Sequence, residues 1–186
     1  MKTLRLSLFM ACFVLACVAR AAQPGDPVID AIDKAYRQAQ EAIKHDSKMG
    51  NDMVTTVRYI VPEKGKTTAT LRFFFKTIQT EMYMPDENVE PYYYHPLYFI
   101  ERTYNVRTHK LCEQYLFDPS TEQFLFALVQ DLDELGQLVE RRYYYHEGDI
   151  YSKQGEPGEP NDEIIVMYQA QDLKRAFDNI IMNPKE

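Results

Sequence analysis

The chain has 186 residues, of which 45% are hydrophobic, which is enough for one domain with a buried core. Its formal charge at neutral pH is −7, because 28 acidic residues outnumber 21 basic ones. An acidic surface repels phosphate groups, so the charge argues against a nucleic-acid-binding protein and against docking on anionic membranes.

The N-terminus has the three parts of a secretory signal peptide. Two basic residues precede an apolar run over 6–18, which is too short to span a bilayer core of about 30 Å as a helix. The sequence at 19–21 then offers the small-x-small pattern that a signal peptidase cleaves. We therefore predict a signal peptide over 1–21, no transmembrane helix, and a single exported domain over 22–186 that is periplasmic or secreted.

A second interpretation of the same segment is a lipoprotein signal. Val14-Leu15-Ala16-Cys17 resembles a bacterial lipobox, in which Cys17 becomes the acylated first residue, although Leu15 fits the pattern poorly. An acyl chain would tie the protein to the cell envelope without a spanning helix. Both interpretations stay open, and we favour cleavage after Ala21.

Cleavage after Ala21 changes both the charge and the cysteine count. It removes three of the 21 basic residues and no acidic one, which takes the charge from −7 to −10. It also removes Cys12 and Cys17, so Cys112 is the single thiol of the mature chain and an internal disulfide is impossible. We expect Cys112 to be a buried, inert thiol in its strand.

The first element of the mature chain is predicted to be an amphipathic helix over 27–46. Asp26 is a suitable N-cap, and Pro27 stands at the first helical position, where its missing N–H costs nothing. The apolar residues recur with the period of a helix, so they form one stripe that needs a surface to cover it. The stripe consists of Val28, Ile32, Ala35, Tyr36, Ala39 and Ile43.

From residue 53 onward the apolar pattern changes to the period of two that is typical of strands. Short turns separate the runs, and because such turns join only antiparallel neighbours, we predict a meander. The exception is a predicted loop over 83–96, which contains three prolines. Seven strands are predicted, near 53–61, 67–79, 97–106, 110–117, 122–130, 138–146 and 149–154.

A polar linker over 155–160 ends the sheet, and a second amphipathic helix is predicted over 161–182. Five consecutive apolar residues over 164–168 also fit a strand, and we favour the helix. The predicted fold class is α+β, with an antiparallel meander of about seven strands packed against an N-terminal and a C-terminal amphipathic helix. Two such helices can cover one concave face of a twisted sheet, which is the arrangement we expect.

No motif in the chain predicts a cofactor, a metal site or a serine nucleophile. The four histidines lack the spacing of zinc ligands. No serine lies in a Gly-x-Ser-x-Gly elbow, and the seven glycines form neither a phosphate-binding loop nor a dinucleotide fingerprint. We therefore predict no cofactor and no metal.

Three glutamates, Glu101, Glu113 and Glu140, lie inside predicted strands, where acidic residues are uncommon. If the turn over 107–109 closes its hairpin symmetrically, Glu101 and Glu113 lie diagonally on one side of the sheet, as in a paired-carboxylate glycosidase. The alternative, which we favour, pairs the glutamates with arginines of the strands on a solvated face. On that view, replacing Glu101 and Glu113 with Gln does no harm to folding.

Tyrosine is the most frequent aromatic residue, with 14 in the chain, and many of these tyrosines crowd the middle strands and the loop before them. Because alternate strand residues face opposite sides, Tyr143 and Tyr145 share one side and Tyr144 takes the other. Exposed tyrosine rings form a flat surface that suits a sugar or a peptide. The candidate binding residues are Tyr92, Tyr94, Tyr143 and Tyr145.

The alternative is that tyrosine serves only as a good strand former in a packed sheet. We favour this alternative, although the tyrosine-bearing face is the most function-like surface in the chain. Phenylalanines are expected to fill the side of the sheet that the helices cover. They are Phe73, Phe75, Phe99, Phe117, Phe124 and Phe126.

Three short strand-like segments carry a loose resemblance to known sequences. They are Tyr92-Tyr93-Tyr94-His95, Glu113-Gln114-Tyr115-Leu116-Phe117-Asp118 and Glu140-Arg141-Arg142-Tyr143-Tyr144-Tyr145. In these segments the chain resembles uncharacterised exported proteins of Bacteroides-like gut bacteria, over about a third of its length. The resemblance implies that the protein is localised in the cell envelope, and it implies no catalytic or binding activity.

Three functional hypotheses follow from the sequence. We favour a non-catalytic exported protein that binds a partner or ligand on its tyrosine-bearing sheet or in a cavity beneath its helices. The second hypothesis is a hydrolase of glycans or peptides that uses Glu101 and Glu113. The third is a carrier of apolar ligands, with a lined pocket between the curved sheet and the helices.

Overall fold

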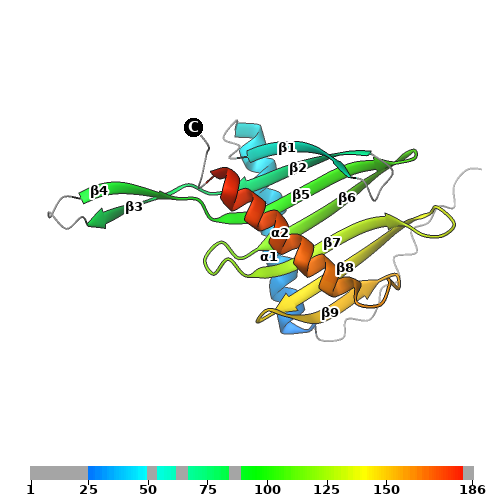
Figure 1. The fold of residues 1–186 in the computed structure, drawn as a ribbon. Helices are drawn as coiled ribbons and strands as arrows, with labels where there is room; N and C mark the ends of the chain where they lie inside the picture. The colour runs from blue at the N-terminus through cyan, green and yellow to red at the C-terminus, as the bar shows by residue number, and fades with distance from the viewer. Residues whose placement is uncertain (1–24, 50–53, 62–66, 84–88, 182–186) are drawn as a thin grey trace, which may run out of the picture.

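The computed structural model of the protein describes residues 25–49, 54–61, 67–83 and 89–181. The predicted signal peptide and Cys17 lie outside these residues. Two helices and nine strands occur in the described part of the chain, which confirms the α+β class (Figure 1). They are α1 (Pro27–Met49), β1 (Val54–Val61), β2 (Thr67–Phe75), β3 (Ile78–Tyr83), β4 (Val89–Tyr94), β5 (Leu97–Val106), β6 (His109–Phe117), β7 (Phe124–Leu132), β8 (Leu138–His146), β9 (Asp149–Gly155) and α2 (Asp162–Ile181).

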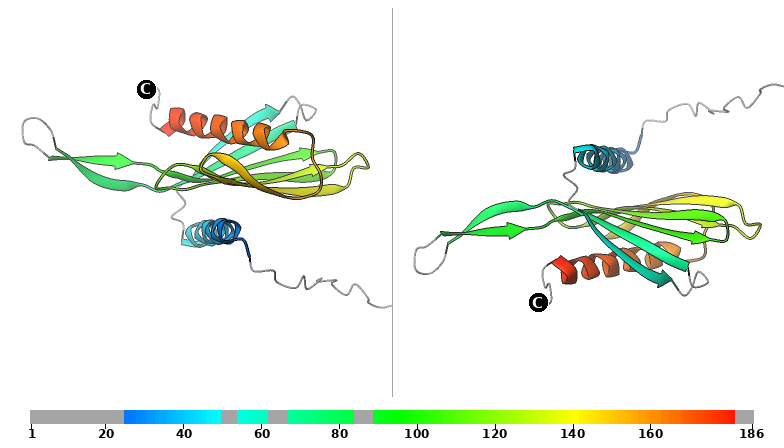
Figure 2. Two further views of the ribbon diagram at one scale, coloured as in Figure 1. Left: turned by 90° about the horizontal axis from the view of Figure 1, so that it is seen from below. Right: turned by 90° about the horizontal axis from the view of Figure 1, so that it is seen from above.

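Seven strands form one antiparallel sheet in the order β1-β2-β5-β6-β7-β8-β9. Each strand from β5 onward lies beside its successor, as the predicted meander requires. β3 and β4 form a separate two-stranded ribbon whose place in the chain is between β2 and β5. Because β2 and β5 are neighbours, the ribbon leaves the sheet at one end and extends away from it (Figures 1 and 2).

The ribbon corrects two sequence predictions. The strand predicted over 67–79 ends at Phe75, after which the N–H of Lys76 donates to the carbonyl of Pro96 at 3.1 Å and closes the base of the ribbon. The loop predicted over 83–96 is a strand at 89–94, while 84–88 lies outside the described residues. The proline inside β4 is tolerated because, among the described residues, β4 has a ladder partner on one side only.

The two helices lie on opposite faces of the sheet, as Figure 2 shows, so the expectation of one covered face is wrong. α1 buries Ile32 and Ala39 against one face, in what we term the α1-side core. α2 buries Val166, Ala170 and Phe177 against the other face, in the α2-side core. The central strands have apolar residues at consecutive positions, so both faces need cover.

The six phenylalanines predicted for one side divide between the two cores. Alternation along each strand and the pairing of neighbouring strands fix which side each ring takes. Phe73, Phe75, Phe117 and Phe124 lie in or against the α2-side core, whereas Phe99 and Phe126 lie in the α1-side core.

The segment 164–168 belongs to α2, which confirms the helix that we favoured over a strand. Val166 faces the sheet, while Ile165 and Tyr168 are exposed on the outer surface of the helix. Five consecutive apolar residues exceed the width of one helical stripe, so part of the run faces outward.

Both helices begin close to the same strand, β9. Asp26 is the N-cap of α1, as predicted, since its Oδ1 accepts the N–H of Val28 at 2.9 Å. Its other oxygen accepts the hydroxyl of Tyr151 from β9 at 2.8 Å. Lys153 of β9 forms an ion pair with Asp162, the first residue of α2.

The α2-side core generates a stability prediction. Phe177 is fully buried and its ring contacts Phe73 and Phe75, with centroids at 5.6 and 5.3 Å. We expect Phe177→Ala to lower the free energy of unfolding by about 3–5 kcal/mol, measured by urea denaturation. Tyr168→Ala, a truncation on the exposed side of the same helix, should cost less than about 0.5 kcal/mol. Equal losses from the two variants would contradict this placement of α2.

Candidate functional site

Glu101 and Glu113, the predicted catalytic pair, lie on opposite faces of the sheet. The hairpin between β5 and β6 closes through two residues and not three, so Val106 pairs with His109. Glu113 is therefore opposite Arg102, and Glu101 is opposite Gln114. A shift of one residue in register reverses the side on which a residue lies. The two carboxylates cannot act on one glycosidic bond, and the glycosidase hypothesis is wrong for this pair.

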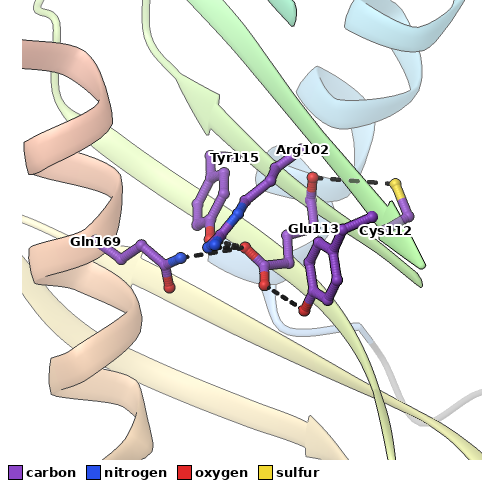
Figure 3. A network of polar contacts seen from close by, with 6 residues as sticks. Arg102, Cys112, Glu113, Tyr115 and Gln169 are labelled. Atoms are coloured by element: carbon purple, nitrogen blue, oxygen red, sulfur yellow. Dashed lines mark hydrogen bonds and ion pairs between the residues drawn. The ribbon is translucent and has the colours of Figure 1, made fainter. Parts of the chain in front are cut away.

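Glu113 is the centre of a buried polar network in the α2-side core (Figure 3). Its side chain accepts hydrogen bonds from Arg102 at 3.1 Å and from the hydroxyls of Tyr104 at 2.7 Å and Tyr115 at 2.8 Å. Gln169 of α2 donates to it at 3.3 Å. Glu113 is only 5% exposed, and four donors match the about four acceptor positions of a carboxylate. The network is a polar part of the core and leaves no acceptor position for a substrate.

Glu101 lies on the α1 side, in a more open setting. Arg72 lies 3.4 Å from it in an ion pair, and the side-chain amide of Gln114 donates to it at 3.5 Å. The hydroxyl of Tyr36 in α1 donates to the same Gln114 side chain. Together with the pairs Arg102–Glu113 and Arg142–Glu140, these contacts confirm that the strand glutamates pair with arginines. Only the pairs of Glu101 and Glu140 are partly solvated, since that of Glu113 is buried.

Tyr143 and Tyr145, predicted to bind a ligand, are buried beneath α2. The hydroxyl of Tyr143 donates to Asp162 at 2.7 Å, and that of Tyr145 donates to the carbonyl oxygen of Glu163 at 2.6 Å. Burial raises the pKa of both phenols well above the ordinary value. Tyr143 and Tyr145 therefore cannot form an exposed binding surface, because a helix covers each face of the sheet at this position.

Tyr92 and Tyr94 lie in β4 of the ribbon, and with them Tyr93, which was not among the predicted binding residues. Tyr92 is 38% and Tyr93 50% exposed, and Ile78 of β3 is 46% exposed. Tyr94 is opposite Ile78 in the ladder, so Ile78, Tyr92 and Tyr94 share one face of the ribbon and Tyr93 takes the other. We term the ribbon with these four residues the tyrosine ribbon.

Tyr94 connects the tyrosine ribbon to the body of the protein. Its hydroxyl donates to Glu122 at 2.9 Å, and this carboxylate raises the pKa of the Tyr94 phenol. The ammonium of Lys174 in α2 lies 2.7 Å from the same glutamate and holds the pKa of the Glu122 carboxyl below its usual range. Asp178 also binds Lys174, at 3.1 Å. The face of the ribbon that carries Tyr94 therefore lies on the α2 side.

A hollow of about 220 Å³ opens beside this connection. Its apolar lining comes from Phe117, Phe124, Tyr145 and Met167, and we term it the aromatic pocket. Glu122 and Lys174 also line it, so its rim contains the ion pair that holds Tyr94. The pocket lies between the β6–β7 turn, the end of β8 and α2.

A wider hollow of about 440 Å³ lies at the other end of β8. Gly155 shapes it, since its φ is +103° and an added Cβ would lie 2.2 Å from the carbonyl oxygen of Glu140. Arg141 lines the hollow, and its buried Nε has no hydrogen-bond partner among the described residues. Asp133 and Glu156 line it too. With Glu140 there are three carboxylates against the one guanidinium of Arg141, so the lining of the hollow is net acidic.

Cys112 lies on the α1 side of β6, as a partly buried free thiol. Burial, and next the charge of Glu101, raise the pKa of its thiol to about 12. Within the described ranges, His, Cys, Asp and Glu side chains form no group of three that could hold a metal ion. Neither helix in this part of the chain is long and apolar enough to cross a membrane.

Sequence reasoning missed Tyr93, Glu122 and Lys174. Tyr93 belongs to the same triplet as the predicted Tyr92 and Tyr94, and it is exposed because neither helix of the described residues covers the ribbon. Glu122 and Lys174 are ordinary charged residues of a turn and a helix, and only the tertiary fold brings them to Tyr94. No family model, curated protein or solved structure gives a significant match to the chain.

The two glutamates give a matched pair of stability tests. Glu113→Gln leaves Arg102 buried without a counter-charge, so we expect the free energy of unfolding to fall by about 3–5 kcal/mol. Glu101→Gln should cost at most about 1 kcal/mol, because its ion pair is partly solvated. Both values are measured by urea denaturation. The sequence-based expectation of a harmless exchange would be restored if Glu113→Gln cost as little as Glu101→Gln.

The raised pKa of Cys112 gives a pH prediction. The folded pKa of about 12 lies above that of an unfolded thiol, so its stabilising effect is complete below about pH 8.5 and is lost as the pH rises toward 12. At pH 9 we expect iodoacetamide to alkylate the folded protein about two to three orders of magnitude more slowly than the urea-unfolded protein. Comparable rates in the two states would show that the thiol is accessible and ionised.

Proposed function

We propose that this is an exported, non-catalytic binding protein that docks a partner on its tyrosine ribbon. The observation that carries the proposal is the exposure of Ile78, Tyr92 and Tyr93 on a ribbon that projects from the sheet (Figure 2). Tyrosine is enriched in the energetically dominant positions of protein interfaces, because its ring is large, rigid and able to form a hydrogen bond.

The architecture of the ribbon supports a role outside the core. A two-stranded ribbon without a third strand or a covering helix is only marginally stable in water. Most of the ribbon extends beyond both helices (Figures 1 and 2). The hydrogen bonds from Lys76 to Pro96 and from Tyr94 to Glu122 tie it to the body at its base. Such an element adds little to the stability of the domain, whereas a partner strand or surface would bury its rings.

The strand glutamates argue against a hydrolase, and the N-terminal segment supports export. The two strand glutamates that suggested a hydrolase are separated by the sheet and occupied by arginines, so their geometry favours a binding protein over that enzyme. The segment over 1–21 has the three-part pattern of a signal peptide, and Cys17 offers the lipoprotein alternative. A partner in the periplasm, outside the cell or at the envelope is consistent with either form.

Selection from a random peptide display library tests the docking surface without a known partner. We expect peptides selected on the protein to bind the double variant Tyr92→Ser/Tyr93→Ser at least about 10-fold more weakly, because aromatic anchors dominate interface energies. Thermal unfolding should be unchanged, since both side chains are exposed.

Tyr168→Ser is the matched control, because Tyr168 is an exposed tyrosine on α2, outside the ribbon. It should leave the affinity of the selected peptides unchanged. Peptides that bind the double variant as tightly as the original protein would place the docking surface elsewhere and refute the proposal.

A further inference from the structure

The interface of the tyrosine ribbon continues into the aromatic pocket, and we propose that this pocket receives one apolar side chain of a basic peptide segment that lies along the ribbon. This inference rests on the proposed function, because it assumes that the ribbon docks a partner. It adds the chemistry of that partner: an aromatic or aliphatic anchor residue flanked by lysine or arginine.

The face of the ribbon that carries Tyr94 is continuous with the rim of the aromatic pocket. Tyr94 donates to Glu122, and Glu122 is both a wall of the pocket and the partner of Lys174. Tyr92 and Ile78 lie on the same face of the ribbon as Tyr94. A segment bound on that face therefore reaches the rim of the pocket without crossing to the other side of the protein.

The size of the aromatic pocket suits a single side chain. Its volume of about 220 Å³ exceeds the ~150 Å³ of a cavity that holds benzene. It is smaller than the roughly 300–1,000 Å³ of sites for small-molecule ligands. The pocket is therefore matched to one large side chain of a bound peptide and not to a whole metabolite.

The apolar walls of the pocket contain a cluster of aromatic rings. The rings of Phe117 and Phe124 have centroids 5.4 Å apart, and those of Phe124 and Tyr145 lie 4.5 Å apart. Met167 of α2 supplies a flexible thioether that adapts to the shape of an inserted group. An aromatic or long aliphatic side chain would complete this cluster of rings, as the anchor residue of an interface does.

The rim of the pocket is acidic. At the rim, Lys174 is shared between two carboxylates, Glu122 and Asp178, so the group carries a net negative charge. The two strands of the ribbon contain two glutamates, Glu81 and Glu90, and neither lysine nor arginine. A basic segment is attracted to this surface, and arginine also stacks on exposed tyrosine rings. A second copy of this acidic chain would be repelled.

A synthetic ten-residue peptide provides the test. It alternates arginine with serine and has one central phenylalanine, and its dissociation constant is measured by fluorescence anisotropy. We expect replacement of the phenylalanine by alanine to weaken binding at least about 10-fold. We expect an analogue with glutamate in place of every arginine not to bind. Failure of the arginine peptide to bind, or equal binding of the glutamate analogue, would overturn the inference.

Two protein variants locate the anchor. Gln171→Trp places a large ring at the pocket from an exposed position of α2, so it should weaken the phenylalanine peptide about 10-fold and abolish the difference between the phenylalanine and alanine peptides. Gln154→Trp, at an exposed position of β9, should change neither affinity. If the phenylalanine–alanine difference persists in Gln171→Trp, the anchor is not in the pocket.

Tyr92→Ser separates this inference from the proposed function. It should weaken the phenylalanine and alanine peptides by a similar factor, because it acts on the ribbon and not on the anchor. Sensitivity to Tyr92→Ser without sensitivity to Gln171→Trp would leave the ribbon as the docking surface and refute the pocket. Insensitivity to both variants would refute both proposals.

Discussion

Both faces of the seven-stranded sheet carry large apolar side chains, and the positions of the other elements depend on this constraint. Tyr143, Tyr144 and Tyr145 follow one another in β8, so at least one ring lies on each face and each face needs a helix. Hydrogen bonds from the tyrosine hydroxyls then fix the position of each helix on its face. The hydroxyl of Tyr143 donates to Asp162 at the start of α2, and that of Tyr144 donates to Asp33 of α1 at 3.1 Å. Apolar burial supplies the driving force, and these directional contacts supply the alignment.

The buried network of Glu113 has a similar role inside the α2-side core. A buried ion pair contributes little net stability relative to apolar residues of the same size, because removing two charges from water is costly. Its value here is specificity. Arg102 and Glu113 meet only when β5 and β6 pair through a two-residue turn, and a slip of one residue would bury each charge without its partner. The hydrogen bond from Gln169 to Glu113 also fixes the position of α2 on the sheet.

The sequence was sufficient for the elements whose signals are local. The cap at Asp26, the helical stripe after it and the period-two strands from β5 to β9 all have such signals, and the structure confirms them. The register of the β5–β6 hairpin had no local signal, because turns of two and three residues both fit Arg107-Thr108-His109. That one-residue difference decided whether Glu101 and Glu113 share a face. Likewise, the pocket and the contact from Tyr94 to Glu122 depend on tertiary packing, which periodicity does not encode.

Among the described residues, the exposed rings of the tyrosine ribbon lack the helix cover and the hydroxyl hydrogen bonds that the tyrosines of β8 have. The tyrosines of β8 are covered by helices and their hydroxyls are bound. Tyr92 and Tyr93 of β4, by contrast, are exposed on a ribbon whose outer edges have no ladder partner in the part of the chain that the structure describes. An exposed edge strand can pair with a strand of another chain and cause aggregation, and proteins protect such edges with proline and charged residues. β4 has Pro91, and Glu81 lies opposite it in β3. Pro91 and Glu81 protect this edge against pairing with the same edge of another copy of the chain. Because the ribbon still exposes aromatic rings, it combines resistance to aggregation with an open binding surface, and a docking element requires both.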